Sequence, residues 1–347
     1  MNTPASARLP RRPAVTQKRL RQGAANAARC MAVHPGDRVF IITDDARMDI
    51  APYVAEACKD AGGDVIVRRL EEYGVRPLTS YPNALRRDLD AARPTVTYFI
   101  ATTPPGELGL RMPLRQHLVE SLKVRHGHMV GITPDLMVDG MCADYDAIYR
   151  RTMQVYDIVK RARTIHVTSE KGSDVTATLS PSLKWYPCHG RYDTPGAFGN
   201  LPEGEVFTSP ETLEGRLVVD ALGDFFGPKY GVLRSPVTFV VEHSELTDIT
   251  GSNATLVDEL RQHFWNAPNG RRPGEFAIGT LEGLTRLTGN ILQDEKMPGL
   301  HVAFGDPLGH FTGATWTSPV HVDVVPRRCT ITVDGREIMR AGVFTIE

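Results

Sequence analysis

Residues 38–68 of the chain read RVFIITDDARMDIAPYVAEACKDAGGDVIVR. The stretch begins with an apolar run that ends in two aspartates, Asp44 and Asp45. Residues 50–61 follow a helical pattern that stops at Gly62-Gly63, and residues 64–68 are again apolar and β-branched. A strand, a helix and a second strand within about thirty residues predict a βαβ unit with parallel strands.

The same alternation continues through the N-terminal half. Helices are expected at residues 16–34, 84–92 and 145–161, and further strands at 95–100 and 128–132. The turn after the first strand lacks Gly-x-Gly-x-x-Gly and carries acids where a phosphate would lie, which disfavours nucleotide binding. We therefore predict an α/β domain over residues 1–160, with a largely parallel sheet, that covers the site formed by the rest of the chain.

From residue 164 the pattern changes to short alternating strands between glycine, proline and aspartate turns. Strands are expected at residues 165–168, 175–179, 206–208, 216–221, 237–242 and 330–333, and helices at 256–265 and 280–293. This pattern predicts an α+β domain over residues 161–347, with a mainly antiparallel sheet that carries a metal site.

Composition argues against several classes of protein. The formal net charge is −1 over 347 residues, without blocks of one sign, so neither nucleic acid nor an anionic membrane is an expected partner. No apolar run reaches about 18 residues, and no membrane span is expected. The basic residues among the first 22, including Arg8, Arg11 and Arg12, precede no apolar segment and predict a flexible arm or a helix start rather than a signal peptide. Five cysteines without a Cys-x-x-Cys pair indicate the reducing cytoplasm.

The candidate chemistry centres on residues 318–325, SPVHVDVV. Side chains alternate across a strand, so His321 and Asp323 share one face, about 7 Å apart along the chain. An imidazole and a carboxylate on a rigid strand suit a metal, and they equally suit an ordinary solvent-facing strand. The pair alone leaves both interpretations open.

Three further donors stand in apolar segments that have no structural need of a charge. Glu205 lies in PEGEVF at 202–207, Glu275 in GEFAIG at 274–279, and His301 in LHVAFG at 300–305. A charge in such a segment is costly unless it is paired or binds a metal. Carboxylates and imidazoles together suit zinc, cobalt, manganese or iron better than calcium.

These segments, in this order, resemble the thermophilic-type aminopeptidases, the aminopeptidase T and aminopeptidase S group of metallopeptidases. The resemblance covers residues 164–347, and the N-terminal half matches in general pattern alone. It implies a homodimer or higher homo-oligomer with a two-metal site. The ligands it implies are Glu205, Glu275, His301, His321 and Asp323.

One position departs from the aminopeptidase pattern. That family has a tyrosine seven residues after the histidine of its His-x-Ala-x-Gly segment, and Leu308 stands there in this chain. His310 follows two residues later. Two interpretations stay open: His310 substitutes for the tyrosine, or the site holds one metal.

The C-terminal half is also similar to the 2,5-dihydroxypyridine 5,6-dioxygenases, mononuclear-iron ring-cleaving enzymes on the same scaffold. The shared block is HVDVVPRRC at 321–329. The resemblance implies a third iron ligand that is a histidine in that branch, at the position of Glu275 here. The presence of both Glu205 and Glu275 favours the hydrolase, whereas the absence of the tyrosine favours the oxygenase.

Three functions are therefore weighed, with the hydrolase first. A metal-dependent hydrolase would cleave a peptide N-terminus or a small amide with water activated by zinc, cobalt or manganese. In it, Glu205 or Glu275 would bridge metals or act as general base. A dioxygenase would hold one Fe(II) with His301, His321 and Asp323 and open the ring of a hydroxylated pyridine or related aromatic. The third is a substrate-binding or structural homologue without catalysis.

Other polar residues have simpler interpretations. Glu203, Glu295 and Asp306 are expected to be solvated turn charges. His126 and His128 would share a face of an extended segment, where they contact substrate or provide loop polarity.

Overall fold

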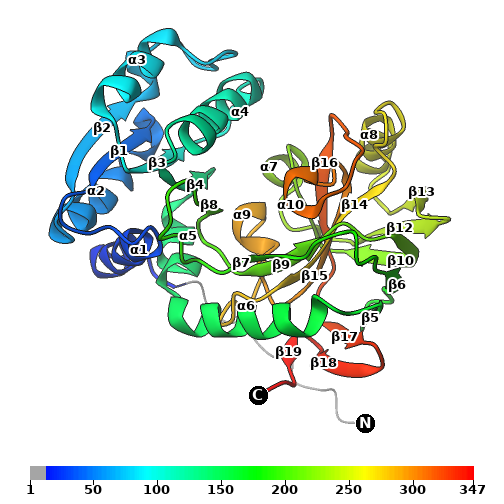
Figure 1. Cartoon of the computed structure of the whole chain (residues 1–347). Coiled ribbons are helices and arrows are strands. Elements are labelled where there is room, and N and C mark those ends of the chain that lie inside the picture. The colour runs from blue at the N-terminus through cyan, green and yellow to red at the C-terminus, as the bar shows by residue number, and fades with distance from the viewer. Residues whose placement is uncertain (1–12) are drawn as a thin grey trace.

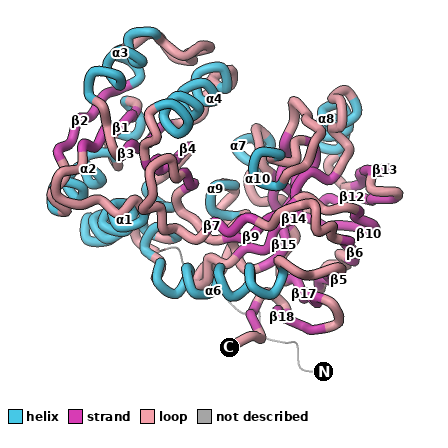
Figure 2. Tube along the Cα trace, in the orientation of Figure 1, coloured by secondary structure: helices cyan, strands magenta, loops and turns pink. Residues whose placement is uncertain are grey.

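The structure, a computed structural model, describes residues 13–347 and contains three β-sheets in that range (Figures 1 and 2). Sheet A has the strand order β2-β1-β3-β4-β8 and is parallel throughout. Sheets B and C are antiparallel. The predicted fold class is confirmed, while Arg8, Arg11 and Arg12 of the predicted basic arm lie outside the described residues.

Sheet A occupies the N-terminal part of the chain and is buried on both faces. Its elements are α1 (Gln17–Cys30), β1 (Arg38–Thr43), α2 (Ala51–Asp60), β2 (Asp64–Arg69), α3 (Asn83–Ala92), β3 (Val96–Ala101), α4 (Leu108–Gln116), β4 (Arg125–Val130), α5 (Pro134–Val138), α6 (Tyr145–Val159) and β8 (Phe198–Asn200). Val39 and Ile41 of β1 pack in the core with α1 and α2, whereas Phe40 and Ile42 pack with α3 and α4. Because helices cover both faces, the central strands read as continuous apolar runs.

Strand β8 comes from beyond residue 160 and pairs with β4 at the edge of sheet A. Helix α6 begins at the side chain of Asp144, which accepts hydrogen bonds from the backbone N–H groups of Asp146 and Ala147. It then runs beneath sheet C (Figure 1). The division into domains at residue 160 stays a prediction.

Sheets B and C form the C-terminal part. Sheet B has the order β13-β12-β10-β6-β5-β17-β18-β19, and sheet C the order β11-β16-β15-β14-β9-β7. The strands are β5 (Thr164–Ser169), β6 (Asp174–Thr178), β7 (Tyr186–Cys188), β9 (Glu205–Thr208), β10 (Thr212–Val219), β11 (Ala221–Leu222), β12 (Val237–Glu242), β13 (Glu245–Thr250), β14 (Pro273–Gly279), β15 (Gly299–Gly305), β16 (His321–Val325), β17 (Cys329–Val333), β18 (Arg336–Arg340) and β19 (Val343–Phe344). The helices are α7 (Phe226–Tyr230), α8 (Ala254–Trp265), α9 (Ile291–Asp294) and α10 (Gly309–Thr312).

The predicted helix at residues 280–293 is wrong. Residues 280–290 form turns and bends, and only the short α9 is helical. Gly283 and Gly289 take positive φ values of 96° and 84°, a conformation that ends a right-handed helix. The irregular segment carries the chain from β14 back to β15.

An aromatic cluster joins sheet B to sheet C. Phe239 of β12 stacks on Phe304 of β15 with ring centroids 5.8 Å apart, and Phe264 of α8 meets both rings edge-on. All three side chains are fully buried. Since Phe304 is on β15, this cluster fixes the position of a strand that also carries His301.

We expect the substitution Phe239→Ala to lower the free energy of unfolding by about 3–5 kcal/mol, because it leaves a cavity between the two sheets. Urea denaturation followed by tryptophan fluorescence measures the change. Phe225→Ala is the matched control, since this ring is 43% exposed and its loss is expected to cost less than about 1 kcal/mol. Equal losses for the two variants would contradict the role given to the cluster.

Candidate metal centre

Sheet C separates its two faces by the alternation of its strands. The apolar side chains at even-numbered positions of β9, β14, β15 and β16, such as Val206, Phe276 and Val302, lie in the hydrophobic core. The odd-numbered residues point to the opposite face. That face brings together all five predicted ligands: Glu205, Glu275, His301, His321 and Asp323.

Small residues stand opposite these side chains in the ladder. Glu205 pairs with Gly279, His301 with Ala277, and His321 with Gly305. Asp323 and Glu275 both pair with Ala303, from either side of β15. Because cross-strand neighbours lie within about 5.5 Å, larger side chains there would fill the space that the charged groups share.

The carboxylate of Glu275 lies between the two imidazoles. Its Oε1 is 3.6 Å from His301 Nε2, and its Oε2 is 3.3 Å from His321 Nε2. His301 Nε2 is also 3.3 Å from Glu205 Oε2, and His321 Nε2 is 3.7 Å from Asp323 Oδ1. The five donors therefore form one continuous cluster along four strands.

One side chain of the cluster reaches solvent. The side chain of His321 is 29% exposed, whereas those of Glu275 and His301 are almost fully buried. With its Nδ1–H donating to the backbone carbonyl of Asp306 at 2.9 Å, His321 turns Nε2 toward the carboxylates. The open side of the cluster is thus at His321.

The acids and imidazoles shift each other's pKa values. Burial alone would raise the pKa of Glu275, but hydrogen bonds and charge from His301 and His321 hold it well below its usual value. Burial alone would lower the pKa of His301, but Glu275, Glu205 and Asp323 raise it to about 9. Asp323 and Glu275 likewise outweigh burial and raise the pKa of His321 well above 6.5. In metal-free protein the protonated form of His301 therefore adds stability that is complete below about pH 6.5 and is lost as the pH rises through about 9.

These residues fit a divalent metal. Four groups of donors among the described residues have ligand atoms within 4.8 Å of one another. Glu275 belongs to two of them, Glu205–Glu275–His301 and Glu275–His321–Asp323; the others are Glu295–His301–Asp323 and a group around Cys188. Glu205 Oε2 is buried and accepts no hydrogen bond within the described chain. A buried acceptor without a donor, beside imidazoles that carry protons, indicates a place built for positive charge.

Three charged residues beside the cluster were not predicted to belong to it: Lys296 and Glu203 are buried, and the side chain of Glu295 is 12% exposed. Lys296 is 1% exposed, and its ammonium bonds Glu205 and Glu295. Glu203, also 1% exposed, accepts a hydrogen bond from Tyr192 at 2.8 Å. The interpretation of Glu203 and Glu295 as solvated turn charges is wrong, because Glu203 is buried against Tyr192 and Glu295 bonds the buried Lys296.

Burial affects the charge of these neighbours. It raises the pKa of Glu203 to about 7 and that of Glu295 to about 8, in both cases against the ammonium of Lys296. For Lys296 burial would lower the pKa, but Glu205, Glu295 and Glu203 raise it well above 10.5. The lysine is therefore a permanent cation at the edge of the metal cluster.

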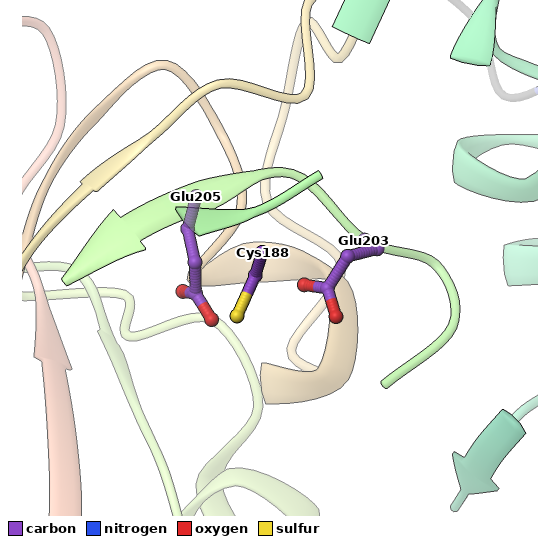
Figure 3. Close-up of side chains that lie close together, drawn as sticks. All are labelled: Cys188, Glu203 and Glu205. Atoms are coloured by element: carbon purple, nitrogen blue, oxygen red, sulfur yellow. The ribbon is translucent and has the colours of Figure 1, made fainter. Parts of the chain in front are cut away.

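Cys188, Glu203 and Glu205 lie close together on the side of the cluster nearest β7 (Figure 3). Burial raises the pKa of the Cys188 thiol well above its usual value, so the sulfur keeps its proton. The Lys296 ammonium bonds Glu205 and is 3.6 Å from Glu203. The carboxylates of Glu203 and Glu205 therefore already have the Lys296 ammonium beside them as a cation. The protonated thiol of Cys188 is a poor metal ligand.

Leu308 and His310 lie at the start of α10, after β15. Leu308 packs against a small apolar cluster of Cys188, Phe207 and Ala277. The ring of His310 is exposed and lies 3.8 Å from that of Phe311. Among the described residues, no donor group that could hold a metal includes His310.

His126 and His128 are buried in β4 rather than in a polar loop. His126 Nδ1 bonds Thr97 Oγ1 at 2.7 Å, and its Nε2 lies 3.1 Å from His128 Nδ1. The rings stack between Phe99 and Phe198. Burial lowers the pKa of His126 to about 3, so the pair is neutral, and the loop interpretation is wrong.

Comparisons with known proteins point to the same two groups. A family model described as NicX, 2,5-dihydroxypyridine 5,6-dioxygenase, matches residues 129–276, a range that includes Glu205 and Glu275. The 2,5-dihydroxypyridine 5,6-dioxygenase of Pseudomonas putida is 29% identical over 205 residues, which are 56% of this chain and 57% of that protein. The sequence match thus spans little more than half of each.

Two solved structures share the fold over nearly the whole chain. The 2,5-dihydroxypyridine dioxygenase of Pseudomonas putida KT2440 superposes with a TM-score of 0.71 at 21% identity, covering 96% of this chain and 99% of that one. AmpT from Thermus thermophilus gives 0.66 at 17% identity, covering 95% and 100%. Both resemblances predicted from the sequence are confirmed. The dioxygenase is matched in sequence as well as in structure, whereas the aminopeptidase match shows the fold alone.

In residues 13–347, no helix is both long enough and apolar enough to cross a bilayer.

We expect the metal affinity of the cluster to rise with pH above pH 6.5, by about tenfold per pH unit for each imidazole proton displaced. The reason is that His321 is protonated in the metal-free protein, and a dication bound to its Nε2 must expel that proton. Competition with a chelator of known affinity, from pH 6.5 upward, measures the slope. An affinity independent of pH in this range would contradict the charge coupling described above.

Proposed function

We propose that the chain is a mononuclear non-haem Fe(II) dioxygenase that cleaves the ring of a hydroxylated pyridine or a related aromatic. The observation that carries the proposal is the group Glu275–His321–Asp323, which is open to solvent at His321 in a chain related in sequence to 2,5-dihydroxypyridine 5,6-dioxygenase. Nitrogen and carboxylate donors with positions left open suit Fe(II) oxygenases. Bound Fe(II) would supply the redox chemistry that activates O₂.

The predicted iron triad changes in composition. His301 and His321 fall in different groups of neighbouring donors, and Glu275 rather than His301 completes the group of His321 and Asp323. Glu275 stands where a histidine is expected in the dioxygenases, so this set would be one histidine and two carboxylates. Two carboxylates hold Fe(II) with a greater negative charge than one, and the charged neighbours His301 and Lys296 offset it.

His321 and His301 have different roles in the proposed reaction. The partly exposed side chain of His321 marks where an aromatic substrate approaches the cluster. His301 lies next to Glu275 and holds a proton near neutral pH, so it keeps a positive charge beside this carboxylate ligand.

A metal-dependent hydrolase acting on a peptide N-terminus or small amide is the second candidate. It is favoured by the two carboxylates, Glu205 and Glu275, on either side of His301, because such carboxylates can bridge two metals or serve as general base. The fold shared with AmpT agrees with it. Zinc, cobalt or manganese would then be the metal. The bond between Lys296 and Glu205 disfavours it.

We expect protein loaded anaerobically with Fe(II) to consume O₂ when 2,5-dihydroxypyridine is added, with loss of the ring absorbance. His321→Ala is expected to lower the rate by at least about 100-fold, because it removes a metal ligand. His166→Ala is the control: this imidazole is 48% exposed on sheet B, pairs with Asp174, and its loss leaves the rate unchanged.

Hydrolysis of aminoacyl amides by the zinc-, cobalt- or manganese-loaded protein, without O₂ uptake by the iron form, would replace the dioxygenase with the second candidate. No turnover of either substrate class by any loaded form would contradict both.

A further inference from the structure

Lys296 is a buried cation held by three carboxylates. Its Nζ lies 2.5 Å from Glu205 Oε1, 2.6 Å from Glu295 Oε1 and 3.6 Å from Glu203 Oε1. The lysine side chain is 1% exposed. Burying an ammonium costs desolvation free energy unless carboxylates are held in place around it. The fold must therefore fix both Lys296 and its carboxylate partners.

The backbone holds the lysine in place. Lys296 N donates to Gln293 O at 3.0 Å, and Lys296 O accepts from Leu281 N at 2.9 Å. The segment passes so close to β14 that a Cβ on Gly279 would lie 2.7 Å from Lys296 O. Gly279 is also the ladder partner of Glu205, so the same glycine admits the lysine and makes room for its carboxylate partner.

Apart from the group around Cys188, the donors offer three positions for positive charge: Glu275–His321–Asp323, Glu205–Glu275–His301 and Glu295–His301–Asp323. In the last two positions a carboxylate, Glu205 or Glu295, already gives one oxygen to the ammonium of Lys296. A dication bound to the other oxygen of that carboxylate would lie within a few ångströms of the ammonium, in a buried setting where like charges repel strongly.

We propose that Lys296 is a built-in cation that takes the place of a second metal, so that the centre holds one divalent ion, at Glu275, His321 and Asp323. The inference rests on the metal-binding part of the proposed function and not on the identity of the substrate. Lys296 is thus a residue that determines metal stoichiometry, and through it the class of reaction that the scaffold supports.

The test is a count of metal ions per chain in wild type and in Lys296→Met. Each protein is stripped with a chelator, reconstituted with Mn²⁺, desalted and measured by elemental analysis. The wild type is expected to bind one ion per chain and Lys296→Met two. The electron paramagnetic resonance spectrum is the second readout, because two Mn²⁺ ions that share Glu275 couple magnetically and one ion does not.

Two further variants keep the test decisive. Lys229→Met removes an exposed lysine that pairs with Glu259, and it is expected to bind one ion like the wild type. Lys296→Met/Glu205→Gln removes the ammonium together with its nearest carboxylate. We expect it to fold even where Lys296→Met alone does not, and to bind one ion because the second position has lost its carboxylate.

A second outcome is expected if Lys296→Met is unstable without metal. Added Mn²⁺ should then raise its thermal midpoint more than that of the wild type, because the ion replaces the missing charge. Two ions in the wild type, or one uncoupled ion in Lys296→Met with no extra stabilisation by Mn²⁺, would overturn the proposal. Neither result depends on ring cleavage, so the inference and the dioxygenase assignment fail separately.

Discussion

Charge balance on one face of sheet C is the constraint on which the rest of the site depends. Alternation along four strands places apolar side chains in the core and Glu205, Glu275, His301, His321 and Asp323 on the other face. Such a face is stable only when cations neutralise the buried carboxylates. Protons on the imidazoles and the ammonium of Lys296 do this in the metal-free chain, and a metal ion is the natural replacement for the protons.

Much of the fold could be predicted because local patterns agree with it. The continuous apolar run of β1 reflects a strand covered on both faces, and the strand at 237–242 has the bounds that its alternation predicts. The helix expected at 280–293 failed because most of its apolar residues reach the core from turns: Leu281 and Leu284 pack there without a helical backbone, and only Leu292 lies in the short α9. Apolar spacing alone does not separate these two cases.

The five clustered donors could be found because each interrupts an apolar strand with a charge. Lys296 could not, since QDEKMPG at 293–299 has the composition of an exposed turn. Its burial follows from the approach of this segment to Gly279, a tertiary contact that leaves no local pattern. Glu203 was misjudged for the same reason, because the turn composition around it gives no sign of its contacts with Tyr192 and Lys296.

A 2,5-dihydroxypyridine dioxygenase and AmpT share this fold, so the fold alone does not decide the reaction. The two functions weighed for this chain differ in the number of metal ions that they need. Here a lysine bonds one of the two carboxylates that a second metal would need. The chain thus has Glu205 and Glu275, the carboxylates that a two-metal hydrolase would use, together with Lys296, a cation that favours a single metal ion as in the proposed dioxygenase.

The measurement that tests this account most directly is an anomalous difference map from crystals grown with Fe(II) under anaerobic conditions, with data collected at the iron absorption edge. The account predicts one peak per chain, within bonding distance of Glu275, His321 and Asp323, with Lys296 still on Glu205. Two peaks that share Glu275, or a peak remote from these residues, would contradict it.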